Sequence, residues 1–318
     1  MKLSTPLKAL AIGGAAYAAA SGLVFYELMG RNAKIPTLAF QMSIKDVEPG
    51  IADDDERVVW FYNQNFEEFE LINADGARLK AYYLPAAEKS DKFLVCSHGY
   101  RSNGKAEFRF AGKFLHDSGF NLFIVDHRAA GESEGQYITF GCKEAEDLLL
   151  WVKFVNEKFG EDIQIGLYGV SMGCATITTL CGCENLPDNV KFAAADCGYT
   201  SAKDEFSYNL QKVHIPDFVI MNSVDFLNRK ISGCSLDDMN PLRAVAKSKV
   251  PILFIHGAKD DFVPVAMAQV LYDACPTEKE LFIAEGAAHA ESYQRQTEEY
   301  EKRFTEFSER FMKETVKE

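Results

Sequence analysis

The sequence predicts an α/β fold with a mostly parallel sheet covered by helices on both faces. From about residue 93 onward, short apolar runs alternate with segments of helical periodicity, which is typical of strands joined by crossover helices. The chain of 318 residues contains 47% apolar and 25% charged residues, as ordinary globular proteins do. That length is sufficient for one large domain with a well-buried core, and a second domain is not required.

The first 34 residues differ in composition from the rest of the chain. The run from Ala9 to Tyr26 has no charge and is rich in alanine, and Arg31 and Lys34 follow it. A bilayer is crossed by about 20 mainly apolar residues. Three alternatives follow for residues 1–34: a membrane anchor, a cleaved secretory signal, or a soluble helical arm. We expect the anchor and a membrane-associated protein, with secretion as the alternative; basic residues on both sides leave the orientation open.

The remaining elements follow in order. Residues 36–65 are expected to form a linker that ends in a short helix. The segments 69–72 and 79–84 flank an Asp-Gly turn, which predicts a β-hairpin. Later strands are expected at 93–96, 122–126, 163–168, 192–195, 252–255 and 281–283. Helices are expected at 105–115, 144–159, 175–180 and 265–274, and a last one at about 291–313, whose aromatic stripe predicts packing on the sheet.

Residues 201–248 form a longer excursion between two strands than a simple crossover needs. The segment is unusually apolar, with Phe206, Phe218 and Met221 among its members. We expect it to form a helical cap that packs on the sheet and shapes a hydrophobic substrate pocket. The chain is therefore divided into the N-terminal segment 1–34 and one domain of residues 35–318 that contains the cap 201–248.

Charge and cysteine content exclude several classes of function. The net charge of −13 argues against a nucleic-acid-binding surface. The eight cysteines do not show the paired spacing of a zinc site, so we expect neither a metal nor a disulfide framework. Cys96, Cys174 and Cys197 fall at strand ends or beside a reactive serine and are expected to be buried free thiols.

That serine stands in the segment Gly169-Val-Ser-Met-Gly173, between the strand at 163–168 and a helix. A serine on a sharp turn between strand and helix is forced into strained backbone geometry that presents its hydroxyl, and the flanking glycines leave room for the turn. The helix N-terminus behind it favours developing negative charge. Ser171 is therefore the candidate nucleophile.

A serine hydroxyl needs a base, and the base needs an orienting acid. Such groups lie in loops at the carboxyl ends of the strands of an α/β sheet. Two later loops supply them in the order serine, acid, histidine: residues 256–264 contain Asp260 and Asp261, and residues 284–289 end in His289. Asp196, at the end of the strand 192–195, is a further acid.

From about residue 65 onward the chain resembles the α/β-hydrolase superfamily. The loop His256-Gly-x-x-Asp-x-x-Val-Pro264 is similar to that of the branch that contains serine aminopeptidases, monoglyceride lipases and membrane-anchored depalmitoylase-like hydrolases. The resemblance implies Asp260 as the triad acid and His289 as the base. Asp261 and Asp196 are the rival acids, since some relatives take the acid from an earlier strand.

Two further loops carry the resemblance. Ser97-His-Gly-Tyr100 resembles the family's oxyanion loop, which implies that the backbone N–H groups of Tyr100 and Met172 bind the oxyanion. The loop from Asp126 to Gly135 resembles a family loop that we interpret as structural, with Arg128 joining loops through buried hydrogen bonds.

These residues favour a serine hydrolase that cleaves an acyl bond through an acyl-enzyme. Carboxylic esters of small-molecule or lipid-like acyl groups are the expected substrates, and no organic cofactor is needed. Aminopeptidase-like cleavage and thioester or deacylase-like cleavage are the alternatives. A catalytically silent module that uses the same fold for binding is a third, because a fold alone does not establish activity. The acyl chain length and the oligomeric state are left open by the sequence.

Overall fold

The computed structural model describes residues 5–33, 55–212, 214 and 216–312. These residues contain an eight-stranded sheet with the strand order β1-β2-β4-β3-β5-β6-β7-β8. β2 pairs antiparallel with β1 and with β4, and every later neighbouring pair is parallel. The mostly parallel sheet expected from the sequence is confirmed. The predicted linker falls mainly on residues 34–54, which lie outside the described part of the chain.

The strands agree closely with the apolar runs of the sequence. The expected hairpin is present, with Phe69 of its first strand opposite Ala81 of its second. The strands are β1 (Glu67–Ile72), β2 (Arg78–Leu84), β3 (Lys92–Ser97), β4 (Asn121–Asp126), β5 (Gln164–Val170), β6 (Val190–Asp196), β7 (Ile252–Gly257) and β8 (Lys279–Ala284).

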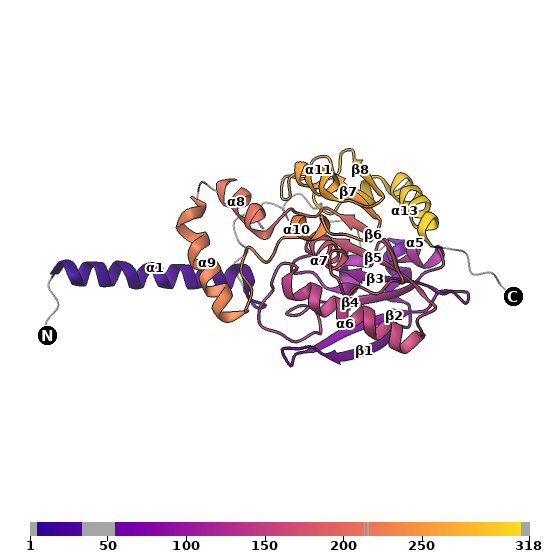
Figure 1. The fold of residues 1–318 in the computed structure, drawn as a ribbon, viewed down its shortest axis with the longest axis horizontal. Helices are drawn as coiled ribbons and strands as arrows, with labels where there is room; N and C mark the ends of the chain where they lie inside the picture. Colours follow the sequence, from indigo (N-terminus) through magenta and orange to yellow (C-terminus); the bar gives the residue numbers. More distant parts are fainter. Residues whose placement is uncertain (1–4, 34–54, 213, 215, 313–318) are drawn as a thin grey trace.

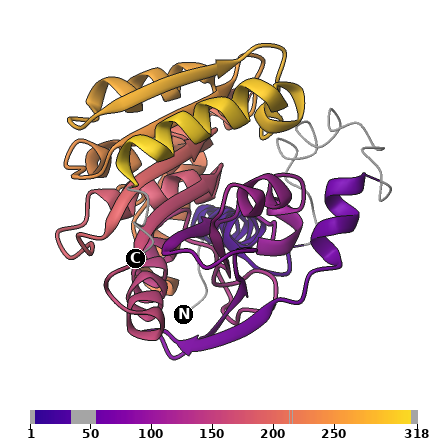
Figure 2. The ribbon, with the colours of Figure 1, turned by 90° about the vertical axis from the view of Figure 1, so that its right-hand side faces the viewer.

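Helices cover both faces of this sheet (Figure 2). On β3, Leu94 and Cys96 face one core cluster, while Phe93 and Val95 face the other, as the alternation of side chains along a strand requires. The first cluster includes side chains of α3 (Glu56–Tyr62), α4 (Gly104–Phe108), α5 (Gly112–Asp117) and α13 (Thr297–Phe311). The second includes side chains of α6 (Cys142–Phe159), α7 (Met172–Cys181), α10 (Pro241–Val245) and α11 (Val265–Ala274).

Two predicted helices are each divided in two. The helix expected at 105–115 is α4 followed by α5, and the second begins at Gly112, whose backbone passes so close to the Phe61 ring that a Cβ would lie 2.4 Å from it. The last helix is α12 (Ser292–Arg295) followed by α13, separated at Gln296, whose φ of −132° and ψ of 45° are not helical. The aromatic stripe of α13 packs on the sheet as expected.

The segment expected to be a cap contains α8 (Ala202–Lys212) and α9 (Asp217–Ile231), and α10 follows them. Its apolar side chains form a third core cluster, in which Phe206, Met221 and Val224 pack together with Met172, the first residue of α7. The extent of the cap and the domain boundaries stay predictions.

The N-terminal segment forms the helix α1 (Thr5–Met29), which projects from the body of the molecule and packs against α9, which crosses it (Figure 1). Its last turns belong to the third core cluster through Phe25 and Met29. In the described part of the chain, we find no helix with both the length and the apolar character needed to cross a bilayer. The membrane anchor predicted for residues 1–34 is therefore without support from the structure.

Candidate active site

The turn that carries Ser171 joins β5 to α7. Ser171 has φ of 55° and ψ of −116°, a conformation that L-residues rarely adopt. Its N–H donates to the carbonyl of Asp196, 2.8 Å away on the neighbouring strand β6. The strained turn is thus fastened to the end of the sheet, with the N-terminus of α7 directly behind the hydroxyl.

The glycines on either side of Ser171 are required by close backbone approaches. A Cβ on Gly169 would lie 2.3 Å from the carbonyl oxygen of Gly173, within the same turn. A Cβ on Gly173 would lie 1.9 Å from the carbonyl oxygen of Ser97, at the end of β3. The second contact brings the end of β3, and the loop that follows it, against the start of α7.

A line of hydrogen bonds runs from Ser171 to a buried carboxylate. Ser171 Oγ lies 2.9 Å from His289 Nε2, and His289 Nδ1 lies 2.8 Å from Asp260 Oδ2. Because Asp260 can only accept, Nδ1 carries the imidazole proton and Nε2 is left to accept the hydroxyl proton of Ser171. The ring of Phe262 meets the His289 ring edge to face, with centroids 5.0 Å apart, and limits its rotation. The structure thus brings together three predicted residues that lie far apart in the sequence.

Asp260 is held in its ionised form. Burial alone would raise the pKa of this carboxyl, but electrostatic attraction to His289 and hydrogen bonds from His256 and His289 hold the pKa well below its usual value. Its other oxygen, Oδ1, accepts the backbone N–H groups of Phe262 and Val263 at 3.0 and 2.9 Å. Both carboxylate oxygens are therefore fixed in position.

His256, in β7, is the residue at this site whose contact the sequence analysis missed. Its Nε2 lies 2.9 Å from the carbonyl oxygen of Val263 and 3.1 Å from Asp260 Oδ2. Both partners accept, so Nε2 carries a proton. Burial lowers the pKa of His256, but the hydrogen bond and charge of Asp260 outweigh it and the net shift is upward. The four-residue spacing between His256 and Asp260 was the available signal in the sequence.

The two rival acids have other partners. Asp261 is exposed and pairs with Lys212 across 3.4 Å. Asp196 is buried and accepts hydrogen bonds from the hydroxyls of Ser292 and Tyr300, each at 3.1 Å. Burial raises the pKa of Asp196 to about 6.

The loop after β3 lies next to the serine. A Cβ on Gly99 would be 3.4 Å from Ser171 Cβ, and the Gly99 N–H donates to Glu107 Oε2 at 3.0 Å. The carbonyl of Gly99 accepts from His98 Nδ1 at 2.7 Å, while His98 Nε2 accepts the N–H of His127 at 3.0 Å. These bonds give His98 a structural role and hold the peptide that precedes Tyr100. The oxyanion donors Tyr100 and Met172 stay predictions.

The hydroxyl of Tyr100 donates to the carbonyl of Leu28, 2.7 Å away, at the end of α1. The neighbouring Arg101 donates to the carbonyl of Glu27. The N–H of Ile138 donates to the carbonyl of Met29 at 2.7 Å. The last carbonyls of α1 are thus bound by loops that border the candidate site, which the sequence analysis did not foresee.

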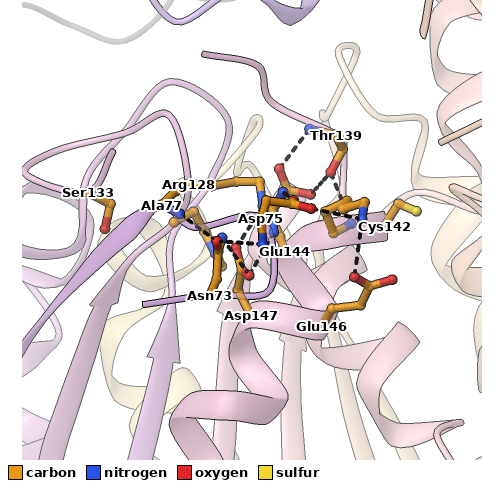
Figure 3. A network of polar contacts seen from close by, with 12 residues as sticks. Asn73, Asp75, Ala77, Arg128, Ser133, Thr139, Cys142, Glu144, Glu146 and Asp147 are labelled. Carbon is orange, nitrogen blue, oxygen red and sulfur yellow. Dashed lines mark hydrogen bonds and ion pairs between the residues drawn. The ribbon is translucent and has the colours of Figure 1, made fainter. Parts of the chain in front are cut away.

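Arg128 has the structural role that we predicted. Its guanidinium donates two hydrogen bonds of 2.7 Å to Asp147 and one of 2.6 Å to Asp75, joining the loop after β4 to α6 and to the hairpin turn (Figure 3). Although burial opposes the charge, Asp147 and other carboxylates raise the pKa of Arg128 above its usual value.

Among the described residues, Cys197, Asp260 and His289 form a group whose donor atoms lie within 4.8 Å of one another, close enough for a metal ion. Asp260 Oδ2 and His289 Nδ1 are already joined by a hydrogen bond. Burial raises the pKa of Cys197 well above its usual value, so its thiol is neutral, which does not favour metal binding. The arrangement fits a proton relay better than a metal site.

Comparisons with known proteins agree with this architecture. Residues 106–315 match the model of the prolyl oligopeptidase family. The chain is 30% identical over 245 residues to the protein YqkD of Bacillus subtilis strain 168, covering 75% of this chain and 79% of that protein. It is also 30% identical to the thiohydrolase aneE of Aspergillus aculeatus, over 116 residues and 36% of each chain.

Among solved structures, an esterase of Pyrococcus furiosus, Pf2001, superposes with a TM-score of 0.63 at 25% identity. The superposition covers 78% of this chain and 92% of the esterase. The strand order, the sharp turn after β5 and the family match over two thirds of the sequence agree with one another. The chain therefore belongs to the prolyl oligopeptidase family of hydrolases, which has the α/β-hydrolase fold.

Proposed function

We propose that the protein is a serine hydrolase that cleaves carboxylic esters, with Ser171 as nucleophile, His289 as base and Asp260 as the orienting acid. The observation that carries the proposal is the unbroken line of hydrogen bonds, 2.9 Å from Ser171 to His289 and 2.8 Å from His289 to Asp260. Nucleophile, base and acid stand in the order and at the distances that proton transfer requires.

The steps follow from this geometry. Ser171 Oγ attacks the acyl carbon while its proton passes to His289 Nε2, and Asp260 stabilises the imidazolium that forms. The backbone N–H groups of Met172 and Tyr100 receive the oxyanion; each such donor contributes about 10²–10³-fold in rate. His289 then protonates the leaving alkoxide, and a water molecule, deprotonated by the same nitrogen, releases the acid and restores the serine.

The apolar cluster next to Ser171 supports an acyl substrate. Met172, the residue after the nucleophile, packs with side chains of α8 and α9, and Tyr100 and Phe262 lie partly buried against the same cluster. Such surroundings favour small-molecule or lipid-like acyl groups over charged ones. An ester makes the least demand on this site because its alkoxide leaves more readily than an amide nitrogen.

Thioester cleavage is the second candidate. The observation that favours it is the likeness to the thiohydrolase aneE, which extends over about a third of the chain. The same serine and base would act on a thioester, with a thiolate as the leaving group. The aminopeptidase-like reaction remains a further alternative within the family.

Labelling by a fluorophosphonate probe tests the proposal. Wild-type protein should label rapidly, and Ser171→Ala should not label. Thr179→Ala, a change of a partly buried hydroxyl farther along α7, is the matched control and should label like wild type. Equal labelling of wild type and Ser171→Ala would contradict the proposal and favour the alternative of a catalytically silent binding module. Kinetics on p-nitrophenyl esters, acyl thioesters and aminoacyl anilides then rank the substrates. If carboxylic esters are the substrates, the p-nitrophenyl esters should have the highest kcat/KM.

We further propose that residues 35–318 form the hydrolase unit, with 201–248 as its cap, and that residues 1–34 determine the location of the protein. Because Phe25 and Met29 are buried in the third core cluster, a deletion of all 34 residues would damage the body. Deletion of residues 1–16 leaves these contacts in place. Fractionation of cells that express both forms tests the membrane prediction, which is wrong if the full-length chain is recovered in the soluble fraction.

A further inference from the structure

Two cysteines from distant parts of the chain meet beside the third core cluster. Cys142, the first residue of α6, and Cys234, in the loop after α9, place their Sγ atoms 2.7 Å apart although 92 positions separate them in the sequence. Both are free thiols. The sulfur atoms of a disulfide lie about 2.05 Å apart, so a small shift would bring this pair to bonding distance.

The backbone that carries Cys142 is held rigidly. The carboxylate of Glu144 accepts hydrogen bonds from the N–H of Thr139 at 2.7 Å and from the Thr139 hydroxyl at 2.6 Å (Figure 3). It also accepts the N–H of Gly141 at 3.0 Å. The N–H of Cys142 donates to the Thr139 carbonyl at 3.1 Å. The buried Tyr199 hydroxyl binds the carbonyl of Phe140 at 2.9 Å. The Cys142 sulfur therefore has a defined position on the body of the domain.

The loop that carries Cys234 is fixed from both directions. Before it, the N–H of Ser232 closes the last turn of α9 on the carbonyl of Asn228 at 2.8 Å. After it, Ser235 donates its N–H to Asp238, and Leu236 donates its N–H to Asp225, at 2.8 and 2.7 Å. Cys234 itself is 2% exposed and packs in the third core cluster. Both sulfur atoms are thus oriented before any bond forms.

We propose that Cys142 and Cys234 are a disulfide-forming pair that links the segment 201–248 covalently to the start of α6, which packs on the helix that follows Ser171. The link reaches α7 because Gly141, next to Cys142, packs directly on Ala175 and Thr176. Oxidation would connect the loop after α9 to the start of α6 by a single covalent bond. Gly141, next to Cys142, contacts α7, the helix that begins immediately after Ser171.

The oxidant is a low-molecular-weight disulfide, RSSR. Cys142, the more exposed of the two, attacks as the thiolate and forms a mixed disulfide, releasing one RS⁻. Cys234 then loses its proton and attacks the Cys142 sulfur, releasing the second RS⁻. Two protein thiols become one disulfide, and RSSR takes up the two electrons. The Cys234 thiol, burial and the Glu144 carboxylate raise the pKa of Cys142, so alkaline pH should accelerate the exchange.

The test is incubation of the full-length protein with glutathione disulfide at alkaline pH, followed by intact-mass measurement and peptide mapping without reduction. Wild type should lose the mass of two hydrogen atoms, and a peptide with Cys142 should be linked to one with Cys234. The oxidised form should unfold at a higher temperature, by on the order of 5 °C. Proteolysis within 201–248 should be slower, and dithiothreitol should reverse both effects.

Three variants complete the test. Cys183→Ser removes another partly buried cysteine and should behave as wild type. Cys142→Ser and Cys234→Ser should each abolish the link. If either variant fails to fold, the peptide map of the wild type still shows whether Cys142 and Cys234 are linked. A stable glutathione adduct on Cys142, a link between other cysteines, or full retention of free thiols at 142 and 234 would each overturn the proposal.

Discussion

Two aspartates at the ends of neighbouring strands have similar burial, but their pKa values are shifted in opposite directions. Asp196 ends β6 with 3% of its surface exposed, and Asp260 follows β7 with 6% exposed. The hydroxyls of Ser292 and Tyr300 bind Asp196, and its pKa rises to about 6. Asp260 receives two histidines and two backbone N–H groups, and its pKa falls. Burial alone does not set the pKa of a carboxyl; the number and kind of its hydrogen-bond donors also decide it.

The largest expected contrast is in activity. Asp260→Asn should lower kcat by about 10⁴-fold, because an amide at this position stabilises the wrong tautomer of His289. Asp196→Asn, the matched substitution one strand away, should change kcat by less than about tenfold. Ester hydrolysis by both variants is the measurement. Comparable losses would mean that the two carboxyls share one role, against the proposed division.

The second contrast is in the pH dependence of stability. The folded-state pKa of Asp196 lies above its usual value of 3.8, at about 6, so its protonated form stabilises the fold. That contribution is complete below 3.8 and is lost as the pH rises through 6, amounting to about 3 kcal/mol of unfolding free energy. Asp196→Asn should lack this loss. Denaturant unfolding of both proteins from pH 4 to 7 measures it, and curves that stay parallel would contradict the assignment.

A third prediction concerns the hydrogen-bond donors of Asp260. His256→Met removes a donor from Asp260, and the less firmly oriented carboxylate should lower kcat/KM about tenfold, which corresponds to one hydrogen bond to a charged group. His256→Gln keeps an N–H near the same position and should recover most of this loss. A lower thermal stability of both variants with unchanged kcat/KM would give His256 a structural role alone.

The smallest effect is expected from Ser292→Ala, which removes one hydroxyl donor from Asp196. The loss of one hydrogen bond should cost about 1 kcal/mol of unfolding free energy. The remaining donor, Tyr300, is itself held by Tyr168 through hydroxyls 2.8 Å apart. The effect should be larger above pH 6, where Asp196 is ionised, than below it. An equal cost at both pH values would show that the Ser292 hydroxyl does not distinguish the two forms.

The sequence was informative where the determinants are local. The Asp-Gly turn predicted the hairpin, and the alternation of apolar runs with helical segments predicted the parallel strands. The glycines around Ser171 predicted a turn whose close contacts the structure contains. The motif loops led to three side chains that the structure joins by hydrogen bonds, while their catalytic roles stay predictions.

Contacts between distant segments could not be predicted in the same way. The bond from Tyr100 to Leu28 joins residues 72 positions apart, and the Cys142–Cys234 contact joins residues 92 apart. Neither pair belongs to a short motif. His256 is near Asp260 in sequence, but the folding back of the loop between them decides that Nε2 meets Oδ2. The cluster of α1 with the cap depends on packing of the same kind.

The docking of the final turn of α1 has a mechanical consequence. Carbonyl groups that would otherwise face solvent at the helix end are bound by Tyr100, Arg101 and Ile138, so the last turn of α1 is joined by hydrogen bonds to loops that border the candidate active site. A force on the amino-terminal end of α1, whether from a lipid surface, a partner or a fusion tag, should therefore act on the hydrogen bonds that Tyr100, Arg101 and Ile138 make with the last turn of this helix. Tags at the amino terminus are therefore expected to perturb turnover more than tags at the carboxyl terminus.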